Sequence, residues 1–330
     1  MRRPYRSSEG RSLLVVGVAV TADILVTVFR FAVATITGSS TLLAQAFQST
    51  AETANQALLF RGHAGARQEE TPRHPFGYAR ERYFWSFLVA LLIFVVGSAA
   101  ALIEAYLEFR SPQPITRAPW AYAALGLAAV SDGSSLFFAR RQARRERAGP
   151  MLDYVRESKN PEISVVMLQD TGAVVGVAIA TVAVTASLLT NTPALDAAGS
   201  AAIGVLLAAV AFALARRMKS LLIGEAASDE ETETIGRIIL RHRDVRDLIS
   251  LRTVYHGPGE LVVEAQVSFD ESLRFRALAQ VIDEIEADIR RQVEAARLVA
   301  IEPAVPRTRD PDVPAWQRPD GASPQSQRPG

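Results

Sequence analysis

Six long apolar segments are the feature that most constrains this chain of 330 residues. A helix that crosses a bilayer needs about 20 mainly apolar residues. Six segments meet that requirement, at residues 12–36, 40–61, 83–108, 118–139, 162–189 and 195–215. A soluble helical protein with a large core rarely carries runs of this length with so few charges. The sequence therefore predicts an α-helical membrane domain with six transmembrane helices over residues 12–223.

Basic residues gather at one side of these segments. They occur in the N-terminal residues 1–11, in the connection 61–82 after the second segment, in 140–147 after the fourth and in 216–219 after the sixth. Basic loops of membrane proteins face the cytoplasm. We therefore expect a multi-pass integral membrane protein with both termini in the cytoplasm. The basic N-terminal tail leads into a long apolar segment without a small-residue cleavage site, which predicts a retained first helix.

Residues 224–304 follow another pattern. An acidic start and spaced apolar residues predict a capped amphipathic helix in SDEETETIGRIILRHRDV. Alternating segments on both sides of GPG predict a hairpin, RFRALAQVIDEIEADIRRQV a second helix and RLVAIEP a last strand. The order αββαβ predicts a small cytoplasmic α+β domain of ferredoxin-like type. Residues 305–330 are rich in Pro, Ser and Gln and are predicted to be disordered.

Composition excludes several classes of function. The net charge of +1 gives no reason to expect a nucleic-acid partner, and the absence of cysteine excludes disulfides and thiolate metal sites. The sequence has no P-loop, nucleophile elbow or dinucleotide fingerprint, so we expect neither an enzyme nor a bound cofactor.

The second apolar segment carries a stripe of polar residues. They recur every three or four positions and so share one face of a helix: Gln45, Gln48, Glu52, and Asn55 or Gln56. Such a face must point to the bundle interior or to a water-filled cavity. Gln169 and Asp170 in the fifth segment are candidates for the opposite wall, which would complete an oxygen-lined cation site. The alternative is a set of interhelical hydrogen bonds that only packs polar helices together.

Three more ionisable residues lie within the apolar segments. Asp23 and Arg30 belong to the first segment and Asp132 to the fourth. Such groups are costly at membrane depth and by default mark a pathway or a site. We predict that Asp23 and Arg30 form a buried pair that orients the first helix.

From Ser12 to Pro303 the chain resembles the cation diffusion facilitator family. The resemblance rests on GSSTLLAQAFQSTAETANQ in the second segment, HPFGYARERYFW entering the third, ESKNPEISVVMLQDTGAVVG entering the fifth and MKSLLIGEAASDEE leaving the sixth. It looks most like the divergent branch with the HPFGY-RERYFW motif. The resemblance implies a homodimer in a lipid bilayer that exports a divalent cation, such as zinc, manganese or iron(II), in exchange for protons. It also implies a charge pair between Arg80 or Arg82 and Glu225.

The metal site implied by the resemblance is degenerate here. Typical members carry His or Asp, three residues, then Asp in both the second and the fifth span. The matching residues of this chain are Gln48, Glu52, Val166 and Asp170, with Gln45 and Gln169 at further positions that are often acidic. Oxygen ligands suit manganese, magnesium or iron(II) better than zinc. The alternative is a non-transporting member that acts as a membrane scaffold or partner subunit.

Overall fold

The computed structural model describes residues 9–146 and 159–305. The chain divides into two compact units. The helical unit lies within Met1–Gln68 and Glu81–Lys219, and the α+β unit lies within Glu69–Arg80 and Ser220–Gly330. Apart from Val305, the predicted disordered tail is outside the described residues, as are residues 1–8 of the predicted N-terminal tail.

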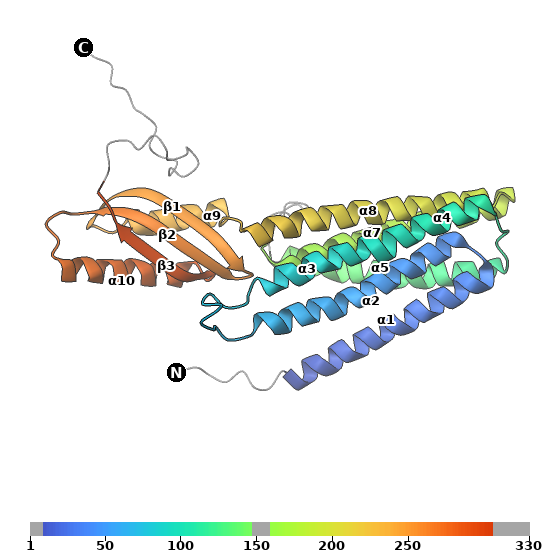
Figure 1. Ribbon diagram of the computed structural model, residues 1–330, viewed down its shortest axis with the longest axis horizontal. Helices are drawn as coiled ribbons and strands as arrows, with labels where there is room; N and C mark the ends of the chain where they lie inside the picture. Colours follow the sequence, from blue (N-terminus) through green and yellow to red (C-terminus); the bar gives the residue numbers. More distant parts are fainter. Residues whose placement is uncertain (1–8, 147–158, 306–330) are drawn as a thin grey trace, which may run out of the picture. The chain divides into compact units, whose positions relative to one another are not determined.

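Long helices lying side by side make up the helical unit (Figure 1). In chain order they are α1 (Glu9–Thr37), α2 (Ser40–Ala66), α3 (Glu81–Leu92), the π-helix η1 (Ile93–Ala99), α4 (Ala100–Arg110), α5 (Ala118–Glu146), α7 (Pro161–Thr190) and α8 (Ala194–Ile223). All six predicted apolar segments are therefore helical, the third as the continuous run α3, η1 and α4.

Within the described residues, four helices are long and apolar enough to cross a membrane. They are Glu81–Arg110, Ala118–Arg141, Pro161–Thr190 and Ala194–Ile223. Helix α2 is long enough, but its stripe of amides and Glu52 makes it less apolar. The helical membrane domain is thus established with four candidate spans, and six crossings remain a prediction.

The start of α2 is fixed by a buried carboxylate. Ser39 caps the helix, its hydroxyl accepting a hydrogen bond from the amide of Leu42 at 3.2 Å. Asp196, in the first turn of α8, is 1% exposed and accepts hydrogen bonds from the hydroxyls of Ser39 and Ser40 at 2.9 and 3.2 Å. A carboxylate is favourable at a helix N-terminus, so this contact ties α8 to the turn before α2.

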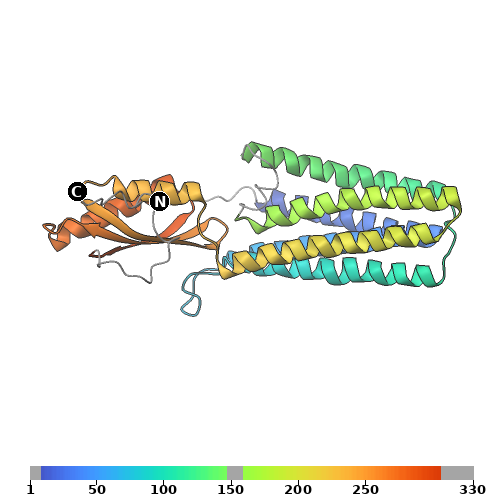
Figure 2. The same cartoon turned by 90° about the horizontal axis from the view of Figure 1, so that it is seen from above.

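The α+β unit follows the predicted order αββαβ. Its elements are α9 (Asp229–Leu240), β1 (Val245–Gly257), β2 (Glu260–Phe269), α10 (Phe275–Gln292) and β3 (Ala296–Pro303). The sheet order is β1-β2-β3, with β1 and β2 antiparallel and β2 and β3 parallel. Alternate residues of β2 are buried, and α9 and α10 cover that face of the sheet (Figure 2).

Two local features of the α+β unit follow directly from the residue types in the sequence. Ser228 and Glu231 form a capping box at the start of α9, as the acidic start of that segment predicted. The hairpin turns through Pro258 and Gly259, and Gly259 has a φ of +72°, which glycine adopts without strain.

The segment Glu69–Arg80 packs within the α+β unit although it precedes α3 in the chain. The ring of Phe76 stacks on His256 of β1, with centroids 5.1 Å apart. Gly257 lies so close to Ala79 that a Cβ atom there would stand 2.3 Å from the Ala79 Cβ. A residue larger than glycine would therefore separate this segment from the strand.

Candidate functional site

The polar stripe of α2 lies in the interior of the helical unit. Gln45, Gln48 and Asn55 are each 2% exposed, and Glu52 is half-buried. Helix α2 packs against α1, α3 and α7, so it occupies a central position in the bundle. This arrangement agrees with the expectation that the stripe faces the protein rather than lipid.

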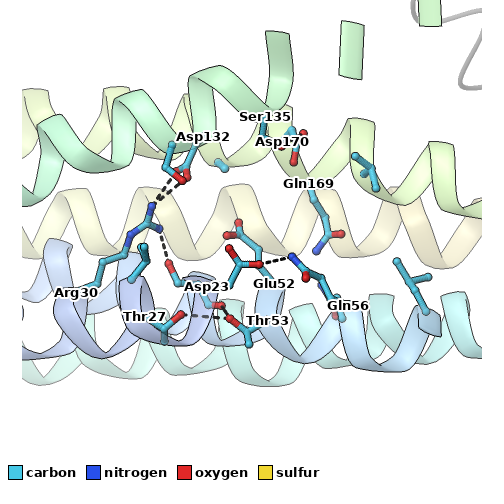
Figure 3. Close-up of a pocket in the computed structure, with 17 residues that line it drawn as sticks. Asp23, Thr27, Arg30, Glu52, Thr53, Gln56, Asp132, Ser135, Gln169 and Asp170 are labelled. Atoms are coloured by element: carbon cyan, nitrogen blue, oxygen red, sulfur yellow. Dashed lines mark hydrogen bonds and ion pairs between the residues drawn. The ribbon is translucent and has the colours of Figure 1, made fainter. Parts of the chain in front are cut away.

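A cavity of about 190 Å³ opens between α1, α2, α5 and α7. Each of these helices contributes one carboxylate to its wall, namely Asp23, Glu52, Asp132 and Asp170 (Figure 3). The predicted wall residues Glu52 and Asp170 therefore do share one cavity, although they are 118 positions apart in the chain.

Both carboxylates are oriented by uncharged donors. The Gln48 side-chain amide donates to Oε1 of Glu52 at 2.9 Å, one helical turn away on α2. The Ser135 hydroxyl of α5 donates to Oδ2 of Asp170 at 2.7 Å. Neither donor brings a positive charge, so the negative charges of Glu52 and Asp170 are not neutralised by these contacts.

The remaining predicted ligands divide into two groups. Gln169 lines the cavity, as does Val166, which is 38% exposed. Gln48 does not line it but borders, with Glu52 and Gln169, a void of about 10 Å³ beside Ile93, the first residue of the π-helix. Single turns of π-helix are frequent at functional sites.

Gln45 does not line the cavity and lies next to Gly176 of α7. A Cβ atom on Gly176 would stand 2.8 Å from Nε2 of Gln45 and 3.1 Å from Oε1 of Gln48. Glycine at this position therefore lets α7 approach both amides. The two polar atoms of the Gln45 side chain are buried without a hydrogen-bond partner, as are those of Asn55, which faces the cavity.

The predicted pairing of Asp23 with Arg30 is wrong. Arg30 pairs with Asp132 of α5, its Nη2 lying 3.0 and 3.2 Å from the two carboxylate oxygens. Asp23 instead accepts a hydrogen bond from the side-chain amide of Gln56 on α2. Seven residues separate Asp23 from Arg30, which places them about 10 Å apart along α1, too far for direct contact unless the long side chain folds back.

Ser135, which donates a hydrogen bond to Asp170, was not among the site residues predicted from the sequence. The available indication was its spacing, because Ser135 follows Asp132 by three positions and must share its face of α5. The sequence left Asp132 without a partner, and the pairing with Arg30 joins residues 102 positions apart.

The predicted charge pair of Arg80 with Glu225 remains a prediction. Arg80 lies near His256 of β1. Burial lowers the pKa of His256, and the positive charge of Arg80 lowers that pKa further. The backbone carbonyl of Glu225 accepts a hydrogen bond from the amide of Tyr255 at 2.9 Å. The alternative partner, Arg82, contacts Glu162 at 2.9 Å within the helical unit.

Comparison with known families decides what kind of protein this is. The family described as the cation efflux transmembrane domain matches residues 16–223, and the family described as the cation efflux protein, cytoplasmic domain, matches residues 227–304. The chain belongs to the cation diffusion facilitator, or cation efflux, family. Its members are transporters whose metal is a transported substrate, which agrees with the prediction of a membrane protein that is not an enzyme.

Three relatives show how far the likeness to cation efflux proteins extends. A human protein named proton-coupled zinc antiporter SLC30A9, mitochondrial, is 32% identical over 259 residues, which are 78% of this chain and 46% of that protein. The mouse protein of the same name is 30% identical, with the same coverage. Metal tolerance protein C4 of Arabidopsis thaliana is 29% identical over 266 residues, 80% of this chain and 58% of that protein. The chain thus spans about half the length of the curated relatives it matches.

For a cation efflux protein, the donor set of the cavity is sparse. Within residues 9–146 and 159–305, no three or more His, Cys, Asp or Glu side chains come together to hold a metal ion. The cavity offers instead the carboxylates of Glu52 and Asp170 with the amide of Gln169. Two carboxylates can neutralise one divalent cation, and the amide can supply a further oxygen.

Proposed function

We propose that this protein moves a divalent metal cation across the membrane in exchange for protons, through a site between Glu52 and Asp170. The observation that carries the proposal is that these two carboxylates, from α2 and α7, line one cavity inside the helical unit. Carboxylates at membrane depth are costly, and a binding pathway accounts for their presence.

The oxygen donors favour a hard cation. Zinc is bound mainly by imidazole and thiolate, and neither is available in this cavity. Manganese(II), iron(II) and magnesium bind well to carboxylate and amide oxygens. We therefore expect manganese or iron(II) to be preferred over zinc, in contrast to what the names of the human and mouse relatives state for those proteins.

Proton exchange follows from ligand chemistry. A carboxylate must lose its proton before it binds a metal ion, so metal and proton compete for Glu52 and Asp170. Metal affinity should consequently fall on acidification. A proton gradient across the membrane would then favour metal binding on the side of lower proton concentration, and metal release with protonation of the carboxylates on the side of higher proton concentration.

The proposal also includes a homodimer formed through the α+β unit and a cytoplasmic location for that unit. The α+β unit keeps one sheet face outside its helices, and Leu298 on β3 is 44% exposed. Pairing of that unit with a second copy, over residues 224–304, would cover such a face and give a two-fold homodimer. The basic connections favour an orientation with this unit and both termini in the cytoplasm. Light scattering of the full chain in detergent should give twice the monomer mass.

Transport by proteoliposomes containing only this protein tests the function. Uptake of manganese, iron(II), cobalt and zinc is compared for the unchanged chain, Glu52→Gln and Asp170→Asn. We expect both variants to lose uptake, because one charge then faces a divalent cation. Glu104→Gln is the matched control, since Glu104 is a half-buried carboxyl of α4 that does not line the cavity. Equal uptake by Glu52→Gln, Asp170→Asn and the unchanged chain would refute the proposed site.

The second candidate is a non-transporting member of the family, acting as a scaffold or partner subunit. It is favoured by Gln48 and Val166, which stand where the resemblance implies two metal ligands. If the unchanged chain binds no metal and Gln48→His with Val166→Asp creates zinc binding, the second candidate is correct. Metal uptake by the unchanged chain excludes it.

A further inference from the structure

One ion pair of the cavity is not used by the proposed transport. Arg30 of α1 and Asp132 of α5 are 4% and 8% exposed, and they lie together at one end of the residues drawn in Figure 3. The guanidinium places Nη2 against both oxygens of Asp132 and directs Nη1 to the hydroxyl of Ser49 on α2. A single arginine thus contacts two other helices inside the cavity wall.

Charge distinguishes this pair from the other carboxylates of the cavity. Glu52 and Asp170 accept hydrogen bonds from Gln48 and Ser135, and Asp23 accepts one from Gln56; all three donors are uncharged. Arg30 is the only cationic side chain among the described residues that line the cavity. Its guanidinium bonds directly to only one of the four carboxylates, Asp132, and the other three have no bonded cation in the described cavity wall.

Stability alone does not explain the pair. Replacing a buried ion pair with apolar side chains of similar volume is often neutral or stabilising, because the desolvation of two charges offsets their attraction. Arginine stays protonated in proteins, so Arg30 holds a positive charge in the cavity whether or not metal is bound. The guanidinium therefore occupies the position in front of both carboxylate oxygens of Asp132.

We propose that Arg30 is a tethered cation that withholds Asp132 from the transported ion and limits the cavity to one divalent cation. This inference rests on the proposed function, in which Glu52 and Asp170 bind that cation. Arg30 is accordingly a specificity-determining residue: it sets how many cations the cavity accepts without itself binding the cargo.

Calorimetry of the full chain in detergent, titrated with manganese(II), provides the first test. The unchanged chain should bind one ion. Arg30→Met removes the charge but keeps much of the apolar stem, and should add a second site or raise affinity by at least about tenfold, because Asp132 is then available. The gain should disappear in Arg30→Met with Asp132→Asn. Arg30→Lys keeps the charge and should still bind one ion.

A second variant keeps the inference testable if Arg30→Met does not fold. Asp132→Asn leaves the guanidinium uncompensated near the cargo, and manganese affinity should fall by about tenfold or more. Removing that charge as well, with Arg30→Met added, should restore the affinity of the unchanged chain. If the pair served only to hold α1 against α5, the double variant would bind manganese no more tightly than the weaker-binding single variant. That result would overturn the inference.

The two proposals fail separately. If the unchanged chain binds no manganese but Arg30→Met gains binding that depends on Asp132, the transport site and the limit of one cation are wrong, and only the withholding of Asp132 by Arg30 stands. If the unchanged chain binds one ion that depends on Glu52 and Asp170, and Arg30→Met changes neither number nor affinity, the role of Arg30 is refuted and the transport site stands.

Discussion

The two units of this protein differ in how they bury polar side chains. In the described part of the α+β unit, no buried side-chain nitrogen or oxygen lacks a hydrogen-bond partner. The helical unit buries several such atoms, including both of Gln45, both of Asn55 and Oε1 of Gln48, all on α2. A buried polar group without a partner costs stability, and native structures contain few of them.

The difference distinguishes buried residues whose presence is explained by packing from buried residues whose presence packing does not explain. The core of the α+β unit is built from aliphatic side chains such as Ile235, Ile285 and Ile289, each at most 1% exposed, and packing explains their presence. The amides of α2 weaken the bundle as it stands. A cation or water in the neighbouring cavity would supply the missing partners of Asn55, which lines it, whereas Gln45 and Gln48 do not line that cavity.

The largest effect should come from opening the core of the α+β unit. Ile289→Ala removes a fully buried side chain and should lower the free energy of unfolding by about 2–5 kcal/mol. Scanning calorimetry of the full chain should show the transition of this unit moving to lower temperature while the helical unit keeps its own. Phe275→Ala is the control, because Phe275 is 86% exposed and should change stability by less than about 0.5 kcal/mol. One transition that shifts as a whole would show that the units are not independent.

The next effect should have the opposite sign. Asn55→Leu replaces two unpartnered polar atoms with an apolar group of similar size, and should stabilise the helical unit by about 1–3 kcal/mol in thermal unfolding. Thr37→Val is the comparison, because the Thr37 hydroxyl donates to the carbonyl of Val33 at 2.7 Å and its removal should destabilise by about 1 kcal/mol. Destabilisation by Asn55→Leu would mean that ordered water already satisfies the amide, and the contrast between the units would weaken.

The smallest effect concerns an exposed carboxylate of the α+β unit. Hydrogen bonds from the side chain and backbone of Ser272, with help from Arg246, hold the pKa of Asp270 at about 2. Because the folded pKa lies below the ordinary value of 3.8, Asp270 stabilises the unit at neutral pH, and this contribution is lost as the pH falls through about 2.

Asp270→Asn should therefore slightly lower the melting temperature at pH 7, and the difference should shrink as the pH falls through about 2. Asp283→Asn, at an exposed position of α10, serves as the control. An identical melting curve for Asp270→Asn and the unchanged chain at pH 7 would contradict the prediction.

Local patterns were sufficient to predict most elements of both units. The apolar runs predicted the six long helices, because span length is set by the bilayer, and Ser228 with Glu231 predicted the start of α9. The spacing in α2 correctly predicted a buried polar face, because 3.6 residues per turn fixes which side chains share a face.

Partners across the bundle could not be predicted in the same way. The face on which Arg30 lies follows from its position in α1, but its partner depends on how α1 and α5 pack and rotate against each other. The sequence therefore suggested the nearer Asp23 on the same helix, whereas the guanidinium reaches Asp132. The π-helix Ile93–Ala99 was not anticipated either. It is a change of hydrogen-bond pattern within an apolar run, and periodicity does not reveal such a change.

The segment Glu69–Arg80 has a consequence for how the protein is made. The α+β unit is discontinuous, because this segment is synthesised before the rest of the unit, with α3 to α8 in between. At roughly 5–20 residues per second, translation of the intervening stretch of about 140 residues takes on the order of ten seconds. During that interval Phe76 has no strand to stack on, since His256 does not yet exist. The α+β unit can therefore complete its fold only after the last membrane helix has left the ribosome, and an expression clone that begins at residue 220 would lack one of its packing segments.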